Sequence, residues 1–162
     1  MIRLFVFTCL VALSLSGKAQ SEDEAILKPI RNLFEAMTLC DSTLAASCFT
    51  ADAMLHGVKT NENGQASLKS FPASKFISII GKPKAEKWHE PIWDIQIQQD
   101  DQLASVWVEY AFYLGNTFSH CGVDSFQLIQ TANGWKIFAL ADTRRTEDCE
   151  VPQAIRKRYE AN

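Results

Sequence analysis

The chain has 162 residues, of which 47% are hydrophobic and 22% are charged. This length corresponds to one domain, and this composition is typical of a globular protein rather than a disordered one. Sixteen Lys and Arg residues stand against nineteen Asp and Glu residues. The chain therefore has no excess of basic charge, which argues against a nucleic-acid-binding protein.

The first 19 residues have the pattern of a signal peptide. A basic start that contains Arg3 precedes an apolar run over residues 4–15, and small residues follow at Gly17 and Ala19. This pattern predicts cleavage after Ala19, and the run is short for a membrane span. The alternative is a buried N-terminal helix or a retained anchor. We expect the mature protein to be periplasmic or secreted, with no membrane segment.

Four cysteines remain after this predicted cleavage: Cys40, Cys48, Cys121 and Cys149. An even number of cysteines in an oxidising compartment permits disulfides, and the sequence allows three pairings. The sequence has no Cys-x-x-Cys motif and no tight Cys/His cluster, so it predicts no metal site.

The predicted domain covers residues 20–150, and its first half favours helices. Ser21 and Glu24 form a capping box, and apolar residues then recur at helical spacing from Ile26 to Met37. Pro29 predicts a kink or an early end to this helix. Asp41 or Ser42 would cap a second helix. The remaining predictions for this half are a helix over 43–49, strands over 54–58 and 66–71, and a third helix over 72–80 that ends before Gly81.

The second half alternates between apolar and polar residues, which is typical of strands. Four strands are predicted, over 88–98, 103–114, 118–131 and 135–143. The turn Asn133-Gly134 is the strongest hairpin signal. Helices followed by antiparallel strands define an α+β fold. Residues 151–162 are expected to form a solvated, charged tail.

Two-residue turns at Gly115-Asn116 and Asn133-Gly134 would fix which residues pair across the last hairpins, unless a bulge shifts the pairing. In this register Gly122 leaves a gap that Glu109 and Arg145 would bridge as an ion pair. In this register one face of the predicted sheet is apolar at one end and polar at the other. A small-molecule pocket needs this combination of an apolar wall and a few polar groups. The candidate pocket residues on this face are Trp107, Glu109, His120, Asp124, Phe126 and Arg145.

The opposite face is also strongly apolar. Because the helices can cover only one face, we expect a second copy of the chain to cover the other, giving a homodimer through the outer sheet face. The residues predicted on this face are Trp93, Ile95, Ile97, Val106, Val108, Tyr110, Phe112, Ile129, Phe138 and Leu140.

The segments 119–128 (SHCGVDSFQL), 133–137 (NGWKI) and 142–145 (DTRR), with shorter ones at 33–37, 92–94 and 106–110, resemble the putative lumazine-binding family. That family belongs to the nuclear-transport-factor-2-like superfamily, with the polyketide cyclase-like and ketosteroid isomerase-like proteins. The resemblance implies a cone-shaped, curved antiparallel sheet that wraps one long and two short helices around an internal pocket. It also implies that Trp135 and Ile137 point inward, and the family name suggests a lumazine or flavin ligand.

Within the predicted pocket, His120 and Asp124 are most similar to an acid–base pair, because a carboxylate can orient an imidazole. The alternative is a polar pair that braces the sheet. Tyr113 flanks the His120 end and is a candidate rim residue. Cys121 faces the other way, near the predicted position of Cys149, which suggests a disulfide between them.

Three functions are compatible with this pattern. The first is an exported domain that binds a small organic ligand without a cofactor. The second is a cofactor-independent isomerase, dehydratase or hydrolase in which His120 and Asp124 transfer protons and Arg145 stabilises negative charge. The third is a dimerising interaction module whose pocket is filled by its own side chains.

Overall fold

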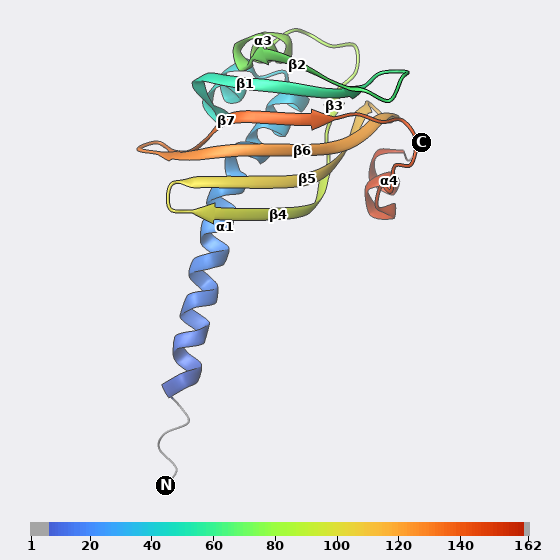
Figure 1. The fold of residues 1–162 in the computed structure, drawn as a ribbon. Helices are drawn as coiled ribbons and strands as arrows, with labels where there is room; N and C mark the ends of the chain where they lie inside the picture. Colours follow the sequence, from blue (N-terminus) through green and yellow to red (C-terminus); the bar gives the residue numbers. More distant parts are fainter. Residues whose placement is uncertain (1–6, 161–162) are drawn as a thin grey trace.

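The computed structural model describes residues 7–160, and side chains from residue 22 onward (Figure 1). Helices come first and strands follow, so the predicted α+β class is confirmed. The elements are α1 (Phe7–Leu39), α2 (Ser42–Cys48), β1 (Phe49–Thr60), β2 (Ala66–Pro72), α3 (Ala73–Ile80), β3 (Trp88–His89), β4 (Ile92–Asp100), β5 (Leu103–Leu114), β6 (Thr117–Thr131), β7 (Gly134–Thr143) and α4 (Gln153–Tyr159).

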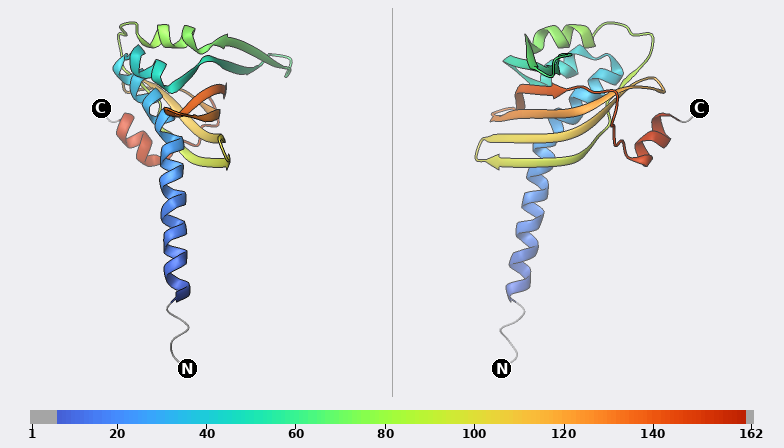
Figure 2. Two further views of the ribbon diagram at one scale, coloured as in Figure 1. Left: turned by 90° about the vertical axis from the view of Figure 1, so that its left-hand side faces the viewer. Right: turned by 45° about the vertical axis from the view of Figure 1, so that its right-hand side comes forward.

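The seven strands form one curved sheet with the order β2-β1-β7-β6-β5-β3, in which β4 also pairs with β5. The pairing of β1 with β7 is parallel, whereas the sequence predicts only antiparallel pairs. Helix α1 crosses the inner face of the sheet (Figure 2). The open, curved sheet and the N-terminal helices give the cone that the resemblance implies.

The apolar stripe of α1 forms one side of the core. Ile26, Ile30, Leu33 and Met37 are buried, as their helical spacing predicts. The helix continues through Pro29 and also through Ser21, so the predicted cap at Ser21 does not begin a helix in the full chain. Of the predicted signal peptide, residues 1–6 lie outside the described residues, and residues 7–19 are helical.

The short helices begin and end where capping residues predict. The Asp41 carboxylate accepts hydrogen bonds from the backbone N–H groups of Thr43 and Leu44, both at 2.9 Å, and Pro72 and Gly81 bound α3. Among the helices of residues 7–160, none combines the length and the apolar character needed to cross a membrane.

A β-bulge at Ser119 makes the predicted register of the β5–β6 hairpin wrong. Leu114 pairs with Thr117 as predicted, but Phe112 pairs with His120, which leaves Ser119 as an extra residue in β6. Beyond this point each pair is displaced by one residue from the prediction, so Val108 lies opposite Asp124. The inner face therefore combines residues that the sequence places on opposite faces: Val106, Val108, Tyr110 and Phe112 with His120, Asp124 and Phe126.

A second bulge at Phe138 reverses the alternation of β7. Leu128 pairs with Ile137, but Gln127 pairs with Ala139, so Phe138 is the extra residue. Trp135 and Ile137 are buried in the core, as the resemblance implies. After the bulge the inward positions are Leu140 and Asp142, two residues apart.

The C-terminal segment, predicted as a solvated, charged tail, is helical, and its charged residues Arg156, Lys157 and Arg158 are exposed. It forms α4, and the ring of Tyr159 stacks on Tyr113 with centroids 5.2 Å apart. The Tyr113 hydroxyl donates a hydrogen bond to Glu160 at 3.0 Å. A disulfide between Cys121 and Cys149, with 5.9 Å between the Cα atoms, also connects this segment to β6.

Candidate functional site

A cavity of about 320 Å³ lies between the helices and the inner face of the sheet. This volume falls within the range of small-molecule sites. The side chains that line it come from α1, α3 and six strands and from two short segments next to the sheet: Leu33, Phe34, Met37, Leu55, Phe71, Phe76, Ile79, Trp88, Glu90, Tyr110, Phe112, His120, Asp124, Leu140, Asp142 and Arg144.

Most of the cavity wall is apolar and aromatic. Phe34 packs edge-on against the core residue Phe126, with ring centroids 6.2 Å apart. Trp88 packs edge-on against Phe112 at 5.7 Å. These contacts hold flat side chains around the space, so the wall favours an apolar or aromatic ring.

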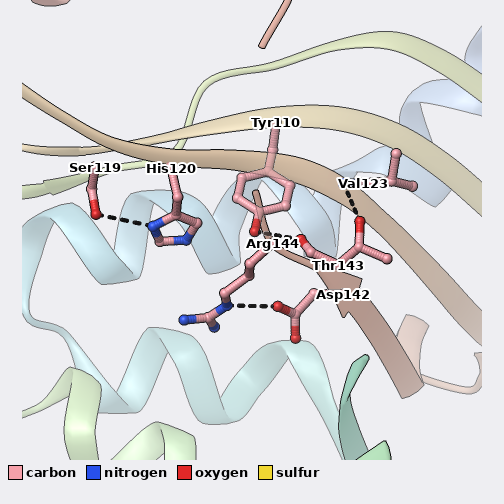
Figure 3. A network of polar contacts seen from close by, with 7 residues as sticks. All are labelled: Tyr110, Ser119, His120, Val123, Asp142, Thr143 and Arg144. Carbon is pink, nitrogen blue, oxygen red and sulfur yellow. Dashed lines mark hydrogen bonds and ion pairs between the residues drawn. The ribbon is translucent and has the colours of Figure 1, made fainter. Parts of the chain in front are cut away.

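The polar side chains of the cavity gather where β5, β6 and β7 lie side by side (Figure 3). The Tyr110 hydroxyl donates to the carbonyl oxygen of Thr143 at 2.9 Å. Arg144 donates from Nε to Asp142 Oδ2 at 2.8 Å. Both interactions fix the side chains, and the second pairs the Asp142 charge with an opposite one.

His120 lies among aromatic rings in this cluster. Its imidazole stacks on Phe112 with centroids 5.0 Å apart, and its Nδ1 is hydrogen-bonded to the Ser119 hydroxyl at 3.0 Å. Burial, with the positive charge of Arg144, lowers the pKa of His120 to about 4. The imidazole is therefore neutral near pH 7.

Asp124 and Glu90 form a pair of carboxyl groups at the cavity. Asp124 is only 2% exposed, and its Oδ2 has no hydrogen-bond donor within the described part of the chain. Burial and the Glu90 charge raise the pKa of Asp124 well above its usual value, and burial raises the pKa of Glu90 to about 7. Two carboxylates can only accept hydrogen bonds, so they form a hydrogen bond with each other when they share a proton.

Glu90 reaches the cavity because the strand is interrupted between β3 and β4, at residues 90 and 91. Pro91 has no N–H for the sheet, and its carbonyl accepts from the N–H of Ala111 at 3.1 Å. The alternation of the sequence predicts an unbroken strand over 88–98, and Glu90 was not among the predicted site residues. The signal was present in the alternation, since Glu90 stands two residues from both Trp88 and Ile92, which face inward.

The structure brings His120 and Asp124 to the same cavity but does not pair them. They are four residues apart on β6, about 13 Å along a strand, and their polar neighbours are Ser119 and Glu90 respectively. Asp124 therefore does not orient the imidazole of His120. The side chain next to Asp124 is Glu90, and the hydrogen-bond partner of the imidazole is Ser119.

The other predicted ligand-binding residues lie outside the cavity. The bulges at Ser119 and Phe138 place Trp107, Glu109 and Arg145 at positions that face away from it, and Trp107 is 48% exposed. Phe126 is buried in the core, and Tyr113 is buried beneath α4.

The same reversal changes which arginine is at the site. In the predicted register Arg145 pairs with Glu109, and strand alternation turns its neighbour Arg144 to the opposite face. In the structure Arg144 lines the cavity, while Arg145 bridges Cys121 through the backbone. In residues 7–160 no three or more His, Cys, Asp or Glu side chains are arranged to hold a metal ion.

The sheet, the helices and the cavity between them give the chain the fold of solved structures described as nuclear-transport-factor-2-like proteins. Residues 21–140 match the family described as putative lumazine-binding, and the chain belongs to that family. The predicted resemblance is thereby confirmed. No curated protein matches the chain.

Solved structures with the same fold have low sequence identity to this chain. A protein of unknown function from Shewanella baltica is 18% identical, with a TM-score of 0.56, over 77% of this chain and 94% of its own. A protein with a cystatin-like fold from Novosphingobium aromaticivorans is 10% identical, with a TM-score of 0.64, over 90% and 96%. A protein described as a putative dehydratase, from Streptomyces avermitilis, is 16% identical, with a TM-score of 0.60, over 78% and 98%.

Proposed function

We propose that the mature protein is an exported domain that binds a small organic molecule in the cavity. The observation behind this proposal is a space of about 320 Å³ that the chain's own side chains leave open, with an aromatic wall and a cluster of polar groups. An interaction module with a filled pocket would have no such space. The Cys121–Cys149 disulfide supports export, because disulfides persist in oxidising compartments.

The wall favours a flat, partly aromatic ligand. Phe34, Phe71, Phe76, Trp88 and Phe112 all line the cavity, and rings of this kind pack well against a planar molecule. The description of the family as putative lumazine-binding is in keeping with a heteroaromatic ring. Lumazine and riboflavin are therefore the first probes to use.

Filling the cavity should abolish binding. Met37→Trp adds bulk at a buried position of α1 that lines the cavity, and it should weaken binding of whichever probe binds by at least about tenfold. Leu39→Trp is the matched control, because Leu39 is exposed on the same helix. The measurement is isothermal titration calorimetry with lumazine, riboflavin and 1-naphthalenemethanol. If none of the three binds the wild type, or if Met37→Trp binds normally, the proposal is wrong.

The Glu90–Asp124 pair supports a second candidate, a proton-transfer enzyme without a cofactor. A carboxyl group with a pKa of about 7 can both give and accept a proton near neutral pH. One protein of the same fold is described as a putative dehydratase. An enzyme of this kind should speed exchange of the acidic C–H protons of 2-tetralone in D2O, observed by NMR, and Asp124→Asn should remove the effect. The absence of exchange would favour binding alone.

We further propose a homodimer through the outer sheet face. The exposed apolar side chains there are Ile95, Leu103, Trp107, Ile129 and Phe138, and the residues that pair with Trp107 are the uncharged Gln96 and Ser125. The carboxylates of Asp94 and Glu109 lie beside Trp107 on this face, so two copies would have to meet with these groups at the rim of the interface, in contact with water.

Trp107→Gln should therefore convert the dimer to a monomer in analytical ultracentrifugation. Leu68→Gln should leave it dimeric, because Leu68 is exposed on β2, away from this face. A monomeric wild type would contradict the dimer without affecting the proposed binding function.

A further inference from the structure

We infer that the ligand of this cavity presents a positively charged nitrogen, an ammonium or amidinium group attached to an apolar ring, to the Glu90–Asp124 carboxyl pair. This inference rests on the proposed binding function and names the chemical class of its ligand. Two carboxyl groups from different elements face one another at the cavity. Asp124 Oδ2 is buried and has no donor within the described residues, and an N–H of a charged ligand would supply one.

The Glu90–Asp124 pair is the source of charge in the cavity that no other cavity side chain neutralises. Arg144 donates to Asp142 at 2.8 Å, so these two residues neutralise each other. The Tyr110 hydroxyl already donates to the Thr143 carbonyl. His120 is neutral near pH 7. The cavity therefore has a net negative charge when the Glu90–Asp124 pair is ionised, and this charge attracts a cation and repels an anion.

The pair also predicts how binding depends on pH. Asp142, Arg144 and Tyr110 are the charged or titratable groups that interact with Glu90 and Asp124. Burial raises the pKa of both carboxyl groups, and that of Glu90 to about 7. Below pH 7 the pair gains protons and loses negative charge. A cation should consequently bind more tightly as the pH rises through 7, and it should release a proton when it binds.

Three compounds with the same ring test the charge preference: 1-naphthylmethylamine, 1-naphthalenemethanol and 1-naphthoate. By calorimetry at pH 7.5 we expect the amine to bind at least about tenfold more tightly than the alcohol, and the carboxylate to bind most weakly. Asp124→Asn should remove most of the difference in affinity between the amine and the alcohol. Asp94→Asn is the matched control, since Asp94 is exposed and lies outside the cavity.

The outcomes separate this inference from the proposed function. If the amine and the alcohol bind equally well, the charged-ligand inference is wrong and the binding function stands. If none of the three compounds binds, the charged-ligand inference is wrong, and the binding function is wrong as well if lumazine and riboflavin also fail to bind. A second measurement does not depend on any variant: the ratio of amine to alcohol affinity in the wild type should rise between pH 6 and pH 8, over which the amine stays protonated. A constant ratio would overturn the inference.

Discussion

Replacing Gly122 with alanine is expected to have the largest effect of any single methyl group added to this chain. A Cβ atom at this position would lie 1.9 Å from the carbonyl oxygen of Thr143 and 2.8 Å from Cε1 of Tyr110. The Thr143 backbone and the buried Tyr110 ring cannot both move away from the added methyl group without breaking the hydrogen bond between them. We expect a loss of at least about 3 kcal/mol of unfolding free energy, the upper end of the usual cost of overpacking.

Gly57→Ala is the matched control for this substitution. Gly57 also lies in a strand, and a Cβ atom there would meet only Asp142 Oδ1 at 3.7 Å and the Lys69 carbonyl at 3.9 Å, which are ordinary contacts. Urea unfolding followed by circular dichroism should give a stability within about 1 kcal/mol of the wild type for Gly57→Ala. A Gly122→Ala protein as stable as the Gly57→Ala protein would contradict the placement of Tyr110 over β6.

Removing the Cys121–Cys149 disulfide is expected to have the second large effect. The two cysteines are 28 residues apart in the sequence, and closing a loop of this length restricts the unfolded chain by an amount equal to roughly 3–4 kcal/mol. The double variant Cys121→Ala, Cys149→Ala should lose about this much unfolding free energy. It should also expose α4 to trypsin, which cleaves after Arg156, Lys157 and Arg158.

The control for the disulfide variant is Cys40→Ala, which removes a free thiol. It should leave both the unfolding transition and the trypsin resistance of α4 close to those of the wild type. If α4 in the double variant resists trypsin as well as the wild type does, the contacts of Tyr113 with Tyr159 and Glu160 are enough to hold it. The disulfide would then not be needed to hold α4 on the sheet.

The sequence predicted the outline of the fold because its signals are local. The apolar stripe from Ile26 to Met37, the Asp41 cap and the alternation of β5 each depend on residues within one or two turns or one strand. The predicted bounds of β5, residues 103–114, are those of the structure. The spacing of such signals within one element can be recognised without knowing which element packs on which.

The site itself was predicted only in part. His120 and Asp124 are at the cavity, whereas Trp107, Glu109 and Arg145 are not. Glu90, Asp142 and Arg144, which the prediction missed or placed elsewhere, complete the polar cluster. One extra residue in a strand exchanges its two faces, and the two bulges at Ser119 and Phe138 account for these differences except that of Glu90. Glu90 was missed because the strand predicted over 88–98 is interrupted at Pro91.

The sequence by itself determined the order and the approximate ends of most elements and the family, but it gave β3 and β4 as one strand and did not predict α4. The tertiary structure decided which face of each strand looks inward. Both faces of β5 carry apolar residues, Val106 and Val108 on one and Trp107 on the other, so polarity did not favour either register. The choice came from packing α1 on one face and α4 on the other, contacts between residues far apart in the chain that no local pattern encodes.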